Sequence, residues 1–120
     1  MISNFLFDSM KENFISILEK KSSSPIDKDD LFIDYNAVLD EKFEKYLDLL
    51  QTQEKLLALA KSKDDELAMQ SALLRLRTYA MSLSSFFDAI VEDTEIILRL
   101  DTWPEIPEGY KLPEYYSDPD

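Results

Sequence analysis

Two long apolar stripes with helical spacing constrain the fold of this chain more than any other feature of its sequence. One lies between residues 39 and 60 and the other between residues 69 and 97, and both advance in steps of four and three residues. Because side chains three and four residues apart share one face of an α-helix, each stripe predicts a long helix with a buried heptad seam. The stripes consist of Leu39, Phe43, Tyr46, Leu50, Gln53, Leu57 and Ala60, and of Met69, Leu73, Leu76, Ala80, Leu83, Phe87, Ile90, Thr94 and Ile97.

Further apolar residues lie beside both stripes and widen the predicted buried faces. They are Leu47, Leu49, Leu56 and Leu59 in the first segment, and Ala72, Tyr79 and Phe86 in the second. A face this wide predicts that each helix packs against more than one neighbour. Aromatic residues at helical spacing beside a leucine stripe are typical of a core, so we expect Tyr79, Phe86 and Phe87 to pack inside and not to line a ligand pocket.

Local signals predict helices at about residues 3–21, 35–61 and 63–100. The first has its own apolar face and ends at the serines and proline of residues 22–25, because serine favours turns and proline disfavours helix in the residue before it. The third ends before Pro104 for the same reason. The short connection between the second and third helices predicts a tight helical hairpin, while a polar linker separates the first helix from the second.

Capping residues are expected at the starts of the second and third helices. Asp34 or Asn36 is predicted to cap the second helix, and Ser62, which is followed by acids, is predicted to begin the third. The apolar segment Leu31–Ile33 precedes the second helix and is expected to act as a plug that covers one end of the bundle.

The sequence therefore predicts an all-α protein with more than about 65% helix. Residues 1–100 would form a three- or four-helix bundle, or an extended helical hairpin with a long third helix. A break near Glu92–Glu95 would convert the end of the third helix into a fourth, and this alternative stays open. Residues 101–120 would form an irregular tail rich in proline, aromatic and acidic residues.

Charge and missing residue types exclude many functions. The chain has 13 basic and 25 acidic residues and a net charge of −12, which disfavours direct binding to nucleic acid. It contains no histidine and no cysteine, so the usual parts of zinc sites and of Ser/His or Cys/His nucleophiles are missing. Its one glycine, Gly109, cannot build a phosphate-binding loop. We expect no catalysis, no cofactor and no metal.

Neither a signal peptide nor a membrane-spanning segment is predicted. Asp8 interrupts the apolar start of the chain, and the longest charge-free stretch, residues 78–87, is only half as long as the roughly 20 residues that a membrane helix needs. The expected location is the cytoplasm.

The C-terminal tail is the predicted partner-binding element. Four of the five prolines lie in it, which lowers the entropy cost of ordering it on a partner. Its large aromatic residues are of types enriched at interface hot spots, and its acids would contact a basic rim. The predicted partner-binding residues are Trp103, Tyr110, Tyr115, Tyr116, Glu105, Glu108 and Glu114. In the alternative interpretation the tail folds back and Trp103 closes one end of the core.

Two pairs of glutamates in the helices are the strongest candidates for a metal site. Glu41 with Glu44, and Glu92 with Glu95, are spaced by one helical turn, and this spacing resembles the acidic pairs of all-α nucleoside-triphosphate pyrophosphatases. The heptad pattern places Glu41, Glu44 and Asp48 opposite the seam, so a solvated face is the favoured interpretation.

Three hypotheses of function follow. The favoured one is a non-catalytic adaptor, chaperone or inhibitor that binds another protein, or a second copy of itself, through an apolar helical face and the tail. The second is an acidic mimic of nucleic acid, similar in composition to phage-encoded inhibitors and antitoxins, that blocks a basic groove. The third is a carboxylate-metal hydrolase of the pyrophosphatase type.

Overall fold

The computed structural model describes residues 5–116, and helical segments account for 71% of it. Its α-helices are α1 (Leu6–Lys21), α2 (Leu39–Ser62) and α3 (Glu66–Leu98), and two short 3-10 turns, η1 (Lys28–Asp30) and η2 (Glu114–Tyr116), complete the order of elements. No strand occurs among these residues. The predicted all-α class with a long third helix is confirmed, and α3 continues unbroken through Glu92–Glu95.

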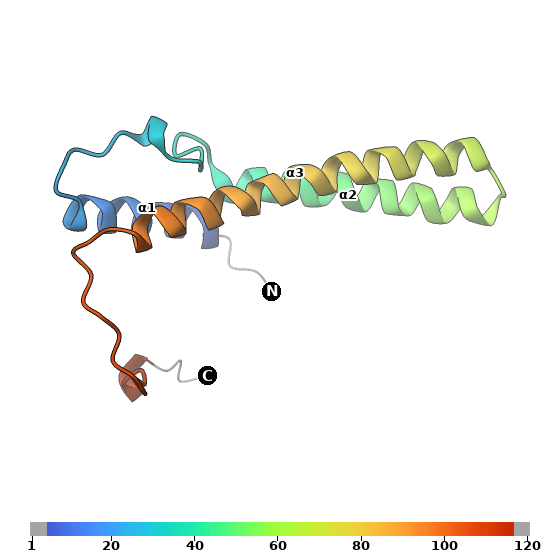
Figure 1. Ribbon diagram of the computed structural model, residues 1–120. Helices are drawn as coiled ribbons and strands as arrows, with labels where there is room; N and C mark the ends of the chain where they lie inside the picture. Colours follow the sequence, from blue (N-terminus) through green and yellow to red (C-terminus); the bar gives the residue numbers. More distant parts are fainter. Residues whose placement is uncertain (1–4, 117–120) are drawn as a thin grey trace.

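Helix α3 is the longest element, and the other two helices lie along it (Figure 1). α2 and α3 form a long antiparallel hairpin, while α1 packs only beside the C-terminal half of α3. The tip of the hairpin therefore projects as a two-helix arm, and the chain spans 60 × 37 × 26 Å. The structure is thus closer to an extended helical hairpin than to an even bundle.

The hairpin turn is tight and is capped by an aspartate. Asp64 has a φ of 53°, a left-handed conformation that aspartate tolerates better than most residues. The Asp65 carboxylate accepts a hydrogen bond from the Ala68 N–H at 3.1 Å, which caps α3. The predicted start at Ser62 is wrong, because Ser62 ends α2 and its hydroxyl donates to the Leu59 carbonyl.

The caps predicted for α2 are also wrong. Asp34 accepts from the Asn36 N–H within its own turn, and α2 begins at Leu39. Its first N–H groups instead donate to Asp8 of α1: Leu39 N lies 2.8 Å from Oδ1 and Asp40 N lies 3.2 Å from Oδ2. A carboxylate that is distant in the sequence therefore supplies the cap.

Asp40 returns the same interaction to α1. Its two carboxylate oxygens accept hydrogen bonds from Phe7 N at 3.1 Å and from Asp8 N at 2.9 Å. The Lys11 ammonium contacts Asp8 at 3.2 Å and donates to the Ala37 carbonyl at 2.7 Å. Because the N-terminal ends of two helix dipoles meet here, the two carboxylates neutralise the positive partial charge of both.

The apolar core lies beside this junction. Phe7, Ile33, Tyr35 and Leu39 are buried together, so the plug contributes Ile33 to the core at the junction of α1 and α2, and does not cover an end of the bundle as the sequence predicts. Phe32 of the plug has 59% of its surface exposed. Four phenylalanine rings from all three helices stack around the core at centroid distances between 4.9 and 6.1 Å; they are Phe7, Phe43, Phe86 and Phe87.

A completely buried aspartate of α3 holds the plug in place. Asp93 accepts hydrogen bonds from Phe32 N at 2.8 Å, Ile33 N at 2.9 Å and the Tyr35 hydroxyl at 2.8 Å. Burial, the hydrogen bond and the negative charge of Asp93 together raise the pKa of Tyr35. A segment without regular structure thereby gains partners for its backbone donors.

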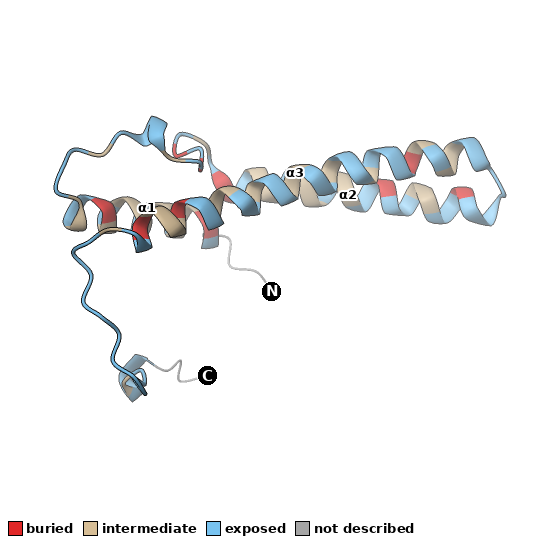
Figure 2. Cartoon of the chain, viewed as in Figure 1, coloured by how far each residue is buried: buried red, intermediate tan, exposed pale blue. Residues whose placement is uncertain are grey.

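The predicted seam of α2 is confirmed, but the seam of α3 lies partly one residue earlier than expected (Figure 2). Ala72, Asp93 and Ile97 are its buried residues, and Tyr79 and Phe86 are half-buried. Leu73 and Phe87, which the sequence places in the seam, have 53% and 44% of their surfaces exposed. This shift leaves Leu73 outside the core and places Phe87 at its edge, where the ring contacts Phe7, Phe43 and Phe86 and still has an exposed side.

Candidate protein-binding surface

The outer face of α3 is the most extensive exposed apolar region on the described part of the hairpin. Large apolar side chains lie at intervals along nearly the whole helix, each with more than two fifths of its surface exposed. They are Leu67, Leu73, Leu74, Met81, Phe87, Val91 and Leu98. Contiguous exposed apolar patches are uncommon on monomers and mark interaction sites, which makes this face a candidate binding surface.

Part of this face has the spacing of a second heptad seam. Leu73, Arg77, Ala80, Ser84, Phe87 and Val91 follow one another in steps of four and three, and all six are exposed. The sequence does not predict this seam, because its periodicity assigns Leu73 and Phe87 to the core. The available signal was the flanking set Ala72, Tyr79 and Phe86, which offers an alternative seam one position earlier.

Trp103 is the anchor of the C-terminal tail. Its indole N–H donates to the Ile97 carbonyl at 2.8 Å, and the Lys21 ammonium lies 4.9 Å from the ring centroid. The Thr102 hydroxyl donates to the Lys21 carbonyl at 3.1 Å, so the tail joins the ends of α1 and α3. Trp103 has 38% of its surface exposed, so it contacts the ends of α1 and α3 without being enclosed in the core.

The other predicted partner-binding residues do not join Trp103 in a compact site. Residues 104–116 project away from the helices (Figure 1), and Tyr110, Tyr115 and Tyr116 are 54%, 79% and 66% exposed. The last two rings contact each other, with centroids 4.5 Å apart. Glu105, Glu108 and Glu114 are exposed along the same segment. The final acids, Asp118 and Asp120, lie outside the described residues.

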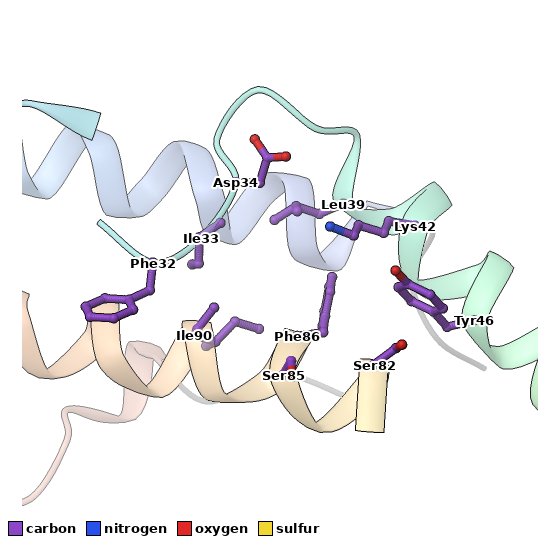
Figure 3. A pocket seen from close by; sticks show the side chains of 11 residues that line it. Phe32, Ile33, Asp34, Leu39, Lys42, Tyr46, Ser82, Ser85, Phe86 and Ile90 are labelled. Atoms are coloured by element: carbon purple, nitrogen blue, oxygen red, sulfur yellow. The ribbon is translucent and has the colours of Figure 1, made fainter. Parts of the chain in front are cut away.

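A pocket of about 270 Å³ lies between the plug, the start of α2 and the middle of α3 (Figure 3). Its walls are mainly apolar, with Phe86 and Ile90 from α3, while Lys42 and Tyr46 of α2 supply polar groups. The volume is slightly below the roughly 300–1,000 Å³ of small-molecule sites. Asp34, Ser82 and Ser85 also line it; the Asp34 carboxylate accepts a hydrogen bond from Asn36 N, and the Ser82 hydroxyl donates to the Thr78 carbonyl.

The carboxylates of the described residues are not arranged as a metal centre. No group of three potential ligands comes together between residues 5 and 116. Glu41 and Glu44 are exposed on α2, as the heptad pattern predicts, and Glu95 pairs with Arg99 at 3.0 Å. The buried carboxylates of Asp40 and Asp93 accept hydrogen bonds from backbone N–H groups.

No described helix has the length and apolar character to cross a membrane. Comparisons with protein-family models, with curated proteins and with solved structures find no match to this chain. The candidate surface therefore has to be interpreted from its own chemistry.

Proposed function

We propose that this chain is a non-catalytic protein-binding module that acts as an adaptor, chaperone or inhibitor. The observation that carries the proposal is the exposed apolar outer face of α3, which extends along a helix whose opposite side is already packed. Burying such a face against another protein is favourable in proportion to the apolar area removed from water. The exposed aromatic residues of the tail add a second contact region.

The polar groups of the core support a binding role over a catalytic one. Asp8, Asp40 and Asp93 would be the strongest candidates for acid–base chemistry, since they are the partly or fully buried carboxylates that hold several hydrogen bonds. Each accepts hydrogen bonds mainly from backbone N–H groups of the chain, with Lys11 beside Asp8 and the Tyr35 hydroxyl on Asp93 as further partners, which supports a structural role.

The tail is proposed to contact a basic rim on the partner. Tyr110, Tyr115 and Tyr116 have the large apolar area and polar hydroxyl that hot-spot residues combine. None of the tail glutamates forms an ion pair with another residue of the described range, so their charges are available to an external cation. Trp103 contributes by fixing where the tail leaves the bundle.

The test is affinity capture from the source cell with the wild-type chain and with a variant that carries Ala in place of all three tyrosines. We expect the variant to lose its partner, and a control with Gln51→Ala and Lys55→Ala on the exposed side of α2 to retain it. The fluorescence of Trp103 reports tail anchoring in both proteins, because this is the only tryptophan. If the triple tyrosine variant and a Leu74→Ser, Met81→Ser variant both capture as much partner as the wild-type chain does, the proposal is contradicted.

Salt dependence separates this function from the acidic-mimic alternative. Contacts between apolar surfaces survive at high ionic strength, whereas binding through many carboxylates weakens steeply. The exposed tail glutamates are the observation that favours the alternative. Loss of capture at high salt, with no effect of the tyrosine substitutions, would support the mimic. Stabilisation by millimolar Mg²⁺ or Mn²⁺ would instead support the hydrolase.

A further inference from the structure

The residue types of the second seam of α3 are distributed symmetrically about its centre. Counted from position 82, Leu73 and Val91 are equally distant, and so are Arg77 and Phe87, and Ala80 and Ser84. Large apolar residues thus lie at both ends of the seam and small residues lie at its centre. A sequence with this arrangement presents matching residues to a copy of itself that runs in the opposite direction.

We propose that the second seam of α3 binds the same seam of a second copy, forming an antiparallel two-fold dimer. The inference rests on the proposed function, because it names the partner of one of its two binding regions. In a two-fold interface the same surface patch is used on both chains. Leu73 then packs against Val91 of the second copy, and Arg77 lies over the ring of Phe87 of the second copy.

The charges beside the seam are complementary in this arrangement. Arg77 and Asp88 are both exposed, and neither forms an ion pair with another described residue. Their positions are also symmetric about the centre of the seam to within one residue, so each Arg77 lies beside Asp88 of the second copy. The two-fold axis forms this pair twice. A parallel arrangement would instead place like charges together.

The small residues at the centre allow the two helices to approach. The distance between packed helices depends on the side chains at their contact, and Ala80 and Ser84 are the smallest members of the seam. The free ends of the hairpin arms extend past the contact on both sides. Tail residues 104–116 leave the opposite end of α3 and stay available for another partner (Figure 1).

The test uses charge reversal and sedimentation of the full-length chain from micromolar to millimolar concentration at physiological salt. The wild type is expected to dimerise. Arg77→Asp alone and Asp88→Arg alone should each weaken self-association at least tenfold, because each creates two like-charge contacts. Mixing the two variants should restore a dimer that contains one copy of each. The double variant, Arg77→Asp with Asp88→Arg, should again associate with itself.

Matched controls separate the seam from overall charge, which at −12 opposes self-association. Arg75→Asp changes the net charge as Arg77→Asp does, and Asp48→Arg matches Asp88→Arg, but both residues are exposed outside the seam. Sedimentation should show that the self-association affinity of each control stays much closer to the wild-type value than the affinity of its matched seam variant does. Circular dichroism checks that every variant keeps its helix content.

The possible outcomes distinguish this inference from the function on which it rests. A wild-type chain that is monomeric at every concentration overturns the dimer, while tyrosine-dependent capture of another protein would leave the binding function standing. If mixing the Arg77→Asp and Asp88→Arg variants does not restore a dimer, the antiparallel pairing is also overturned. If mixing the variants restores the dimer but affinity capture finds no other protein, the result supports the seam and removes the proposed role of the tail.

Discussion

The carboxylates of Asp8 and Asp40 each cap the helix that carries the other. Asp8 accepts from Leu39 N and Asp40 N, while Asp40 accepts from Phe7 N and Asp8 N, so the N-termini of α1 and α2 meet at a single junction. From this junction α1 and α2 point away from each other, and α3 lies along both. The exposed two-helix arm exists because α1 and α2 both begin at this junction and run in opposite directions, so α1 does not extend along the arm.

Loss of either cap should destabilise the fold measurably. Asp8→Ala and Asp40→Ala are each expected to lower the free energy of unfolding by about 1–2 kcal/mol, because each leaves two helix N–H groups without their acceptor. The double variant should cost less than the sum, since either loss loosens the same junction. Urea denaturation measures all three. A change no larger than that of Asp48→Ala, on the exposed side of α2, contradicts the capping role.

Acid should weaken the fold through Asp8. Burial acts to raise the pKa of its carboxyl, but the hydrogen bonds from Leu39 N, Asp40 N and Lys11 outweigh this and hold the pKa below its usual value of 3.8. The unfolded chain therefore binds the proton more readily, so this stabilisation is present above pH 3.8 and is lost as pH falls below it. Asp8→Asn should show a smaller loss of urea midpoint below pH 4 than the wild type; parallel curves would contradict this.

Among single positions at the core beside the plug, Asp93 should be the one whose substitution lowers the free energy of unfolding most. Asp93→Ala leaves the Phe32 and Ile33 N–H groups and the Tyr35 hydroxyl without their acceptor, and we expect a loss of more than about 2 kcal/mol of unfolding free energy. Amide exchange at Phe32 and Ile33 should accelerate with it. Glu92→Ala is the matched control, since Glu92 is the exposed neighbour. Unchanged exchange at the plug would show that Asp93 does not hold it.

Tyr35 should keep its proton in alkaline solution. Its pKa is raised above the ordinary value of 10.0, so the stabilisation it provides is complete below that pH and is lost as pH rises through the pKa of the folded state. The ultraviolet absorbance of tyrosinate should therefore show that one of the six tyrosines keeps its hydroxyl proton until the chain unfolds. Tyr35→Phe should remove only the late phase of the titration. If it removes the early phase, the assignment is wrong.

Gln53 should be a site where a substitution stabilises the protein. It is buried in the seam between α2 and α3, and its side-chain oxygen has no hydrogen-bond partner among the described residues. Gln53→Met keeps the length of the side chain and removes the unsatisfied acceptor, so we expect a gain of about 1 kcal/mol in unfolding free energy. Gln51→Met, at an exposed position two residues away, should change stability little. A loss on Gln53→Met would show that the oxygen is satisfied.

The helices themselves follow from local sequence. Periodicity identifies α2 and α3, serine and proline end α1 near residue 22, and acids next to the seam of α2 face outward as predicted. These features depend on interactions within one helical turn or on the hydrophobicity of one face. Pattern analysis detects such features because the residues involved are three or four positions apart.

Tertiary structure alone decides which apolar residues of α3 are buried and which carboxylates act as caps. α3 carries apolar side chains over more than one face, so its periodicity accepts Phe86 or Phe87 in the seam, and packing against Phe7 and Phe43 buries Phe86 more deeply. Asp8 and Asp93 bind backbone groups that lie 31 or more positions away, and no local pattern marks such partners. The exposed second seam is a consequence of that choice of phase, because burying one row of side chains leaves the adjacent row in water.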